Sequence, residues 1–343
     1  MTDMKKILPL AAALCVIAGS CAKESTINTG VKAQQYLGMF MEKYYPLVKA
    51  DENGLYILED IEGDGDPWVQ DSAFVYASYT LRTLDGAISS STEDAIARQL
   101  GTYKESNYYG PRYMAQGKGS SFAGLDALFD GMKAGGYRKA VIPAWMLNTS
   151  RFDTQQQYIN ACSTETHMIY DVRFYGQTND IQRTEIDSLE RYVLRKFNAD
   201  RKESSSYTDD TTEGTFYFFS DTTEFAGGRH FPQDTTLKIN YTGYLLNGQV
   251  FDTTDEITAK DARIYVRGKT YEPVSVTFSP TVANIKMGSS SPVSGFQGGL
   301  SKMVFLGQKA TFLFTSSLGY TGSGSGSSIP PYSPLVFEVE IVK

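Results

Sequence analysis

Two stretches of this chain, far apart in the sequence, share one pattern of strand and turn residues. "ASYTLRTLDG" at 77–86 and "INYTGYLLNG" at 239–248 each carry a Tyr-Thr pair, with a glycine seven residues after the tyrosine. Asp-Gly and Asn-Gly are strong signals for a tight hairpin turn. A pair of glycines spaced by seven follows in each half, Gly117 with Gly124 and Gly288 with Gly295. The chain is therefore expected to contain two copies of one design.

The segments around these repeats predict both helices and strands. Apolar side chains at helical spacing predict helices at 31–45 and 186–197, and apolar runs predict strands at 54–58 and 215–219. The last segment, 335–342, alternates in a period of two, which is typical of a half-buried strand. We therefore expect an α+β fold with two tandem domains.

Composition excludes some functions. The chain has 343 residues, enough for two domains, with a net charge of -7 and a pI near 5.1. Nucleic-acid binding normally depends on clustered Lys and Arg, so no nucleic acid is expected as a partner. His167 and His230 do not fit a metal-ligand spacing, and neither a metal site nor a cofactor is expected.

The first twenty residues read as a secretion signal rather than as part of the fold. Lys5 and Lys6 precede an apolar run, and small residues then lead to Cys21. This pattern resembles a bacterial lipoprotein signal, with Cys21 as the lipidated first residue of a tether and N-terminal helix at 21–50. A plain signal peptide with a coincidental cysteine is the alternative. The lipid would place the protein in the cell envelope, anchored in a membrane, in the periplasm or on the outer-membrane surface.

The second repeat carries motifs that together identify a family. "LKINYTGYLLNGQVFD" at 237–252, "GFQGGLSKM" at 295–303, "LGY" at 318–320 and "IPPYSPLVFEVEIV" at 329–342 occur in the order found in FKBP-type peptidyl-prolyl cis/trans isomerases. The resemblance runs from Leu237 to Val342. It implies an antiparallel sheet wrapped around a short helix, here near 296–303, with an apolar pocket between them.

The resemblance also implies the functional residues. It assigns substrate binding to an aromatic and apolar wall, and catalysis to three further positions. Among these, the N–H of Ile329 and the hydroxyl of Tyr320 would bond substrate carbonyls. Pro330 and Pro331 would hold the Ile329 amide ready. The implied substrate-binding residues are Tyr241, Phe251, Val293, Phe296 and Phe337, and the implied catalytic residues are Asp252, Tyr320 and Ile329. Taken singly, each of these aromatic residues fits a core position equally well, and Asp252 a turn.

This sequence departs from the family in its aromatic floor, at Pro292, where an apolar residue is usual, and in the length of one loop. Phe296 stands where a tryptophan is usual. The segment between Asp252 and Gly288 is longer than the family's loop, and possible extra strands at 264–266 and 274–278 would either cover the pocket or widen its recognition surface.

The first repeat matches the family less well. Ser89 and Ser90 correspond to Phe251 and Asp252, and Leu125 corresponds to the floor residue Phe296. The position of Tyr320 falls near Asn148. Residues 51–178 are expected to form a degenerate, inactive FKBP-like domain. A linker helix and polar linker follow at 179–213, and the isomerase domain at 214–343.

Two functions of different classes fit this sequence. The first is an anchored prolyl isomerase that assists the folding of exported, proline-containing polypeptides. The second is a non-catalytic FKBP-like lipoprotein that binds partners in an envelope assembly. The oligomeric state cannot be read from the sequence.

Overall fold

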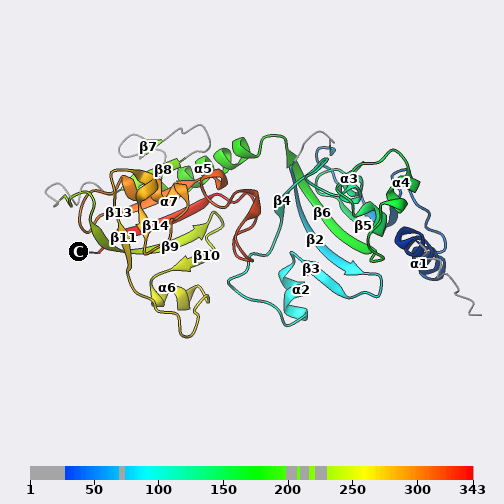
Figure 1. Cartoon of the computed structure of the whole chain (residues 1–343), viewed down its shortest axis with the longest axis horizontal. Coiled ribbons are helices and arrows are strands. Elements are labelled where there is room, and N and C mark those ends of the chain that lie inside the picture. Colours follow the sequence, from blue (N-terminus) through cyan, green and yellow to red (C-terminus); the bar gives the residue numbers. More distant parts are fainter. Residues whose placement is uncertain (1–27, 69–73, 198–206, 209–215, 221–229, 343) are drawn as a thin grey trace, which may run out of the picture.

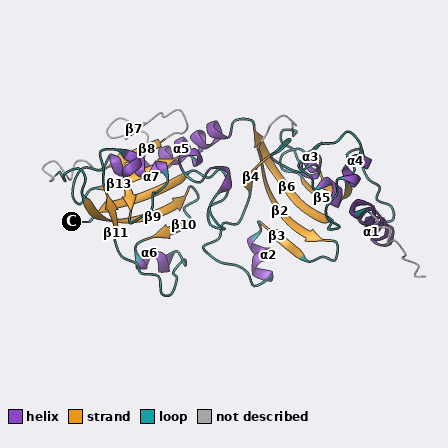
Figure 2. Cartoon of the chain, in the orientation of Figure 1, coloured by secondary structure: helices purple, strands orange, loops and turns teal. Residues whose placement is uncertain are grey.

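The computed structural model describes residues 28–68, 74–197, 207–208, 216–220 and 230–342. Two sheets lie side by side, with α5 running from the first toward the second (Figure 1). Strands and helices are mixed in both halves, which confirms the expected α+β class (Figure 2). The signal and Cys21 lie outside the described residues.

The N-terminal half contains four α-helices and six strands among the described residues. α1 begins after Asn28, whose side chain accepts a hydrogen bond from the N–H of Gly30. The elements in chain order are α1 Thr29–Tyr44, β1 Tyr56–Ile61, β2 Phe74–Thr83, β3 Ile88–Ser91, α2 Asp94–Gln99, β4 Arg112–Ala115, α3 Ala123–Phe129, β5 Tyr137–Ile142, α4 Gln155–Asn160 and β6 Met168–Thr178.

The linker helix and the C-terminal half follow. Their elements are α5 Ile181–Phe197, β7 Tyr207–Thr208, β8 Phe216–Ser220, β9 Thr236–Leu245, β10 Val250–Thr253, α6 Glu256–Asp261, β11 Val274–Thr277, β12 Lys286–Met287, α7 Ser294–Ser301, β13 Lys309–Phe314 and β14 Leu335–Ile341.

The two sheets repeat one topology. In the first, β1, β5, β6 and β2 are successive neighbours, and β2 also pairs with β3 and β4. In the second, β8, β13, β14 and β9 are successive neighbours, and β9 also pairs with β10 and β11. All of these pairings are antiparallel. These six strands of the second sheet repeat the six of the first, and β7 and β12 are additional.

The Tyr-Thr repeat has the same hydrogen bonds in both halves. The N–H of Tyr79 donates to Oγ1 of Thr92 at 2.8 Å, and the N–H of Thr92 returns to the Tyr79 carbonyl at 2.9 Å. Tyr241 and Thr254 make the same two bonds at 2.9 and 3.0 Å. Because both pairs are thirteen residues apart, the match places Ser89 and Ser90 at the positions of Phe251 and Asp252.

The structure explains why glycine stands at both positions of each glycine pair. Gly117 and Gly288 have φ angles of 96° and 58°, which favour glycine because it lacks a Cβ atom. A Cβ atom on Gly124 would lie 2.3 Å from the side chain of Ile142, and one on Gly295 would lie 2.4 Å from the ring of Phe314. These second glycines let α3 and α7 approach β5 and β13.

α5 fastens the linker to the C-terminal half. Leu189, Tyr192 and Val193 pack against Leu313 and Val336, on the face of the second sheet opposite its main core. The buried carboxylate of Glu185 also accepts bonds from the N–H and the hydroxyl of Ser316, at 2.5 and 2.6 Å. Both faces of the second sheet are therefore covered.

One local expectation was wrong. Residues 264–266 are not a strand; their segment follows α6, and the N–H of Ile264 donates to the carbonyl of Ala259 at 2.9 Å. The polar linker contains a short strand, β7, which pairs with β8. The strand expected at 274–278 is confirmed as β11, and the helix expected at 296–303 as α7.

None of the helices in the described ranges is long and apolar enough to cross a membrane.

Candidate functional site

A cavity of about 290 Å³ opens between β9, β10, β14 and the start of α7. All eight residues that the sequence assigned to the pocket line it. Tyr241 lies on β9, Phe251 and Asp252 on β10, Phe296 on α7 and Phe337 on β14, and loops supply Val293, Tyr320 and Ile329. Four lining residues were not among the predicted site residues: Met287, Pro292, Ser325 and Ser328.

Phenylalanine rings form the floor and one wall of the cavity. The ring of Phe337 lies 4.8 Å from that of Phe296 and 5.4 Å from that of Phe251, with both pairs edge to face. Phe296 and Phe337 are buried, while Phe251 is half-buried. The rings require a glycine beside them, because a Cβ atom on Gly243 would lie 2.5 Å from the ring of Phe251.

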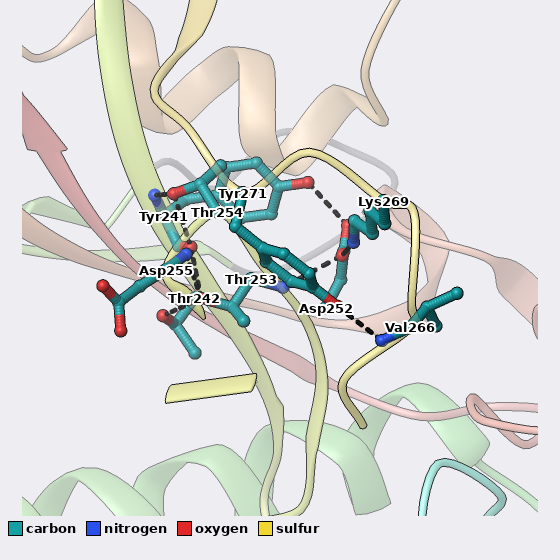
Figure 3. A network of polar contacts seen from close by, with 9 residues as sticks. All are labelled: Tyr241, Thr242, Asp252, Thr253, Thr254, Asp255, Val266, Lys269 and Tyr271. Carbon is teal, nitrogen blue, oxygen red and sulfur yellow. Dashed lines mark hydrogen bonds and ion pairs between the residues drawn. The ribbon is translucent and has the colours of Figure 1, made fainter. Parts of the chain in front are cut away.

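Asp252 is held by three donors of the chain itself (Figure 3). Its Oδ2 accepts from the hydroxyl of Tyr241 at 2.5 Å, and its Oδ1 lies 2.7 Å from the ammonium of Lys269 and accepts from the N–H of Thr253 at 2.9 Å. The carboxylate side chain is 38% exposed, so it lies at the cavity's edge. Its orientation is fixed by contacts on both oxygens.

Lys269 is a site residue that the sequence did not reveal. It comes from the segment inserted after Asp252, and no local motif links the two positions. The one signal in the sequence was the long insertion directly after Asp252, which indicates that some inserted residue lies near the site.

The two tyrosines of the cavity are hydrogen-bond donors rather than acids. Burial, with Asp252 nearby as a smaller cause, raises the pKa of both Tyr241 and Tyr320 above the ordinary value. Tyr241 already donates to Asp252. No partner for the Tyr320 hydroxyl is found among the described residues, so this group is free to donate to a ligand.

The Ile329 amide, expected to bond a substrate carbonyl, has a partner within its own loop. Its N–H donates to the carbonyl of Ser325 at 3.1 Å, and the N–H of Ser325 donates back to Ile329 at 2.8 Å. The amide is therefore engaged within the loop, although the side chain of Ile329 lines the cavity and is buried. We call residues 325–329 the rim hairpin.

The start of α7 offers another backbone donor. Val293 is the N-cap of α7, and no acceptor for its N–H is found among the described residues. The first N–H groups of a helix lack intrahelical partners and lie at the positive end of its dipole. A carbonyl bound in the cavity would meet a favourable potential there.

The inserted segment leaves the cavity open. Of the residues between Asp252 and Pro292, only Met287 lines it. Lys269 reaches the edge through Asp252, while α6 and β11 contribute no lining residue. Of the two expectations for this segment, covering the pocket is not what the structure shows.

The corresponding positions in the N-terminal half are not aromatic. Ser89 and Ser90 are exposed on β3, Leu125 is buried in α3, and Asn148 follows a short 3-10 helix. The first half keeps the scaffold of the site without its aromatic wall.

Comparison with known proteins gives a consistent match for the C-terminal half. Residues 227–342 match the family model described as FKBP-type peptidyl-prolyl cis-trans isomerase. A probable FKBP-type peptidyl-prolyl cis-trans isomerase of Haemophilus influenzae is 35% identical over 107 residues, which are 31% of this chain and 34% of that protein. FK506-binding protein 2 of Dictyostelium discoideum is 33% identical over 106 residues, which are 31% of this chain and 62% of that protein.

The match thus spans less than two thirds of the length of either relative. Among solved structures, FkpA from Escherichia coli is 23% identical, with a TM-score of 0.30, over 48% of this chain and 62% of that one.

Proposed function

We propose that the C-terminal half, whose residues 227–342 match the model of the FKBP-type peptidyl-prolyl cis-trans isomerase family, catalyses rotation about X-Pro bonds. The observation that supports this most strongly is the cavity of about 290 Å³, where an aromatic wall, a free tyrosine hydroxyl and a helix N-terminus converge.

The chemistry needs no nucleophile, base or metal. The barrier to rotation is about 18–20 kcal/mol because amide resonance is lost in the twisted state, and the unaided reaction takes tens to hundreds of seconds or so. No covalent bond changes. A catalyst therefore has only to bind the twisted amide more tightly than either planar form.

The cavity residues suit that task. Phe251, Phe296 and Phe337 would hold the proline ring and exclude water, which disfavours the charge-separated resonance form of the amide. The hydroxyl of Tyr320 and the N–H of Val293 would donate to substrate carbonyls. Asp252 would act by charge and by orienting Tyr241 and Lys269 rather than as a proton acceptor.

A protease-coupled assay on a short X-Pro peptide tests this function. Wild type should exceed the spontaneous rate, while Phe251→Ala and Asp252→Ala should lower kcat/KM. The matched controls Ser89→Ala and Ser90→Ala alter the equivalent positions of the N-terminal half and should leave the rate unchanged. A wild-type rate equal to the spontaneous one would refute the function, and a loss in the serine variants would refute its assignment to the C-terminal half.

A second function has one observation in its favour. Both oxygens of Asp252 already have partners within the chain, which suits a binding module that holds proline-containing segments without turnover. Such a module would bind the same peptides with the spontaneous rate unchanged, so the assay above separates the two functions.

We also propose that the protein works in the cell envelope, anchored by lipid on Cys21, and assists the folding of exported polypeptides. The apolar run before Cys21 and the basic residues ahead of it support this proposal. Mass spectrometry of the N-terminal peptide from membranes should show a lipid-modified Cys21, and Cys21→Ser should release the protein. An unmodified Cys21 in the wild type would contradict the proposal.

A further inference from the structure

One loop of the N-terminal half touches three segments of the C-terminal half, one of which lines the cavity. We call residues 103–111, between α2 and β4, the bridging loop (Figure 1). Its Glu105 pairs with Arg263 of the inserted segment at 3.1 Å, and the carbonyl of Asn107 accepts from Nε2 of Gln249, beside the β9–β10 turn, at 3.0 Å. The third contact lies on the rim hairpin.

The rim hairpin lies between this loop and the cavity. Ser325, Ser328 and Ile329 line the cavity, while the carbonyl of Ser327, at the tip, accepts from the N–H of Tyr108 at 2.8 Å. The N–H of Tyr108 thus holds the outer side of a hairpin whose inner side is the cavity wall.

Apart from the buried side chain of Ile329, the rim hairpin is held mainly by its own backbone. Gly324 and Gly326 have φ angles of 63° and 54°, and the hairpin is closed by the two bonds between Ser325 and Ile329. Ordering a backbone residue costs about 1–2 kcal/mol of conformational entropy. An external contact that keeps these five residues ordered therefore reduces the entropy that the loop would lose when a ligand binds.

The Tyr108 side chain joins the two halves. Its ring packs against the hydrophobic core of the C-terminal half, although its loop belongs to the N-terminal half. Its hydroxyl donates to the carbonyl of Pro111 at 2.8 Å, and burial raises its pKa above the ordinary value. Phe74 adds a second contact across the seam, edge to face with Tyr332 at 5.0 Å.

We propose that Tyr108 is a positioning residue of the isomerase site, through which the N-terminal half orders the rim of the C-terminal cavity. This inference rests on the proposed function and gives the half without an aromatic pocket a task of its own. A rim held in its binding geometry lowers the entropy lost when a proline-containing segment binds. The contribution therefore appears in KM more than in kcat.

The test uses the full chain and three variants. Tyr108→Ala removes the ring that seats the bridging loop, and Tyr108→Phe keeps the ring and loses only the hydroxyl. Tyr44→Ala is the control, because Tyr44 is 57% exposed on α1 of the same half. For each, kcat and KM are measured separately on a short X-Pro peptide, and hydrogen exchange is measured at the amides of Ser325 and Ile329.

Tyr108→Ala should raise KM about tenfold with kcat little changed and should speed exchange at both rim amides about tenfold, a size that corresponds to losing one modest contact. The amides of β9 and β14 should stay protected, and Tyr108→Phe and Tyr44→Ala should behave as wild type. Unchanged rim exchange would overturn the proposal. Equal acceleration across β9 and β14 would also overturn it, because Tyr108 would then be a general stability residue.

The exchange measurement does not depend on turnover. If the wild type proves inactive, the proposed function fails, and the exchange rates of Ser325 and Ile329 still decide whether Tyr108 orders the rim.

Discussion

The ammonium of Lys269 lies 2.7 Å from Oδ1 of Asp252, and this contact joins the inserted segment to the edge of the candidate site. The two side chains are 43% and 38% exposed, so water screens the pair. Exposed ion pairs contribute about 0–1 kcal/mol. The pair is therefore expected to adjust substrate preference rather than to create activity.

Removing the lysine should change the preference for charge next to the proline. In Lys269→Gln, Asp252 loses its counter-ion, so kcat/KM for a Glu-Pro peptide should fall relative to an Ala-Pro peptide, by up to about fivefold at low salt. The control is Arg267→Gln on the same loop, which should leave the ratio as in wild type. An unchanged ratio in Lys269→Gln would mean that Lys269 does not influence the substrate.

Two adjacent glycines of α7 should respond in opposite directions to the same substitution. A Cβ atom on Gly299 would lie 2.2 Å from the ring of the fully buried Phe312, whereas one on Gly298 would meet nothing within 4 Å. Gly299→Ala should lower the free energy of unfolding by about 1–3 kcal/mol through overpacking. Gly298→Ala should raise it by about 0.5–1 kcal/mol, because alanine favours a helix. Denaturant unfolding measures both, and shifts of the same sign would contradict the packing of α7 on β13.

His167 should make the N-terminal half sensitive to acid. Its Nδ1 accepts from the N–H of Ala144 at 3.0 Å, so its Nε2 carries the proton and donates to the carbonyl of Ala33 at 2.9 Å. Burial lowers the pKa of His167 to about 4. Because the pKa is lower when folded than when unfolded, protons bind the unfolded state preferentially. The free energy of unfolding should fall by about 3 kcal/mol as the pH drops from about 6.5 to about 4. Above that window His167 is neutral in both states, so its titration should not change the stability.

His167→Gln provides the comparison, because an amide can make both hydrogen bonds without titrating. The difference in unfolding free energy between wild type and variant should change across that pH window and stay flat above it. A constant difference from pH 7 to pH 4 would show that His167 is not held neutral.

The parts of the fold that could be predicted are those set by neighbouring residues. Alternation along β14 correctly placed Leu335, Phe337, Val339 and Ile341 in one core. It could not show that Val336, on the other face of the strand, is buried as well. The residues that bury Val336 belong to α5, which is far away in the sequence. The segment 264–266 failed for a related reason. Its Tyr265 and Val266 are 42% and 57% exposed, and an apolar run becomes a strand only where another strand pairs with it.

The candidate site shows the same limit. The resemblance named eight residues that do line one cavity, since motifs in a fixed order on a known topology fix positions well. It could not supply Lys269 or Tyr108, whose contacts come from an insertion and from the other half of the chain. Nor could it show that the Ile329 amide donates to the carbonyl of Ser325 within its own loop.

The central claim is that the aromatic cavity of the C-terminal half speeds cis-trans interconversion. Two-dimensional exchange NMR on a short X-Pro peptide, with a small amount of the full chain added, measures that interconversion without a coupling protease. Wild type should produce exchange cross-peaks between the cis and trans proline signals within about a second, far faster than the unaided tens of seconds, and Phe251→Ala should weaken them. Cross-peaks no stronger with wild type than with peptide alone would contradict the account.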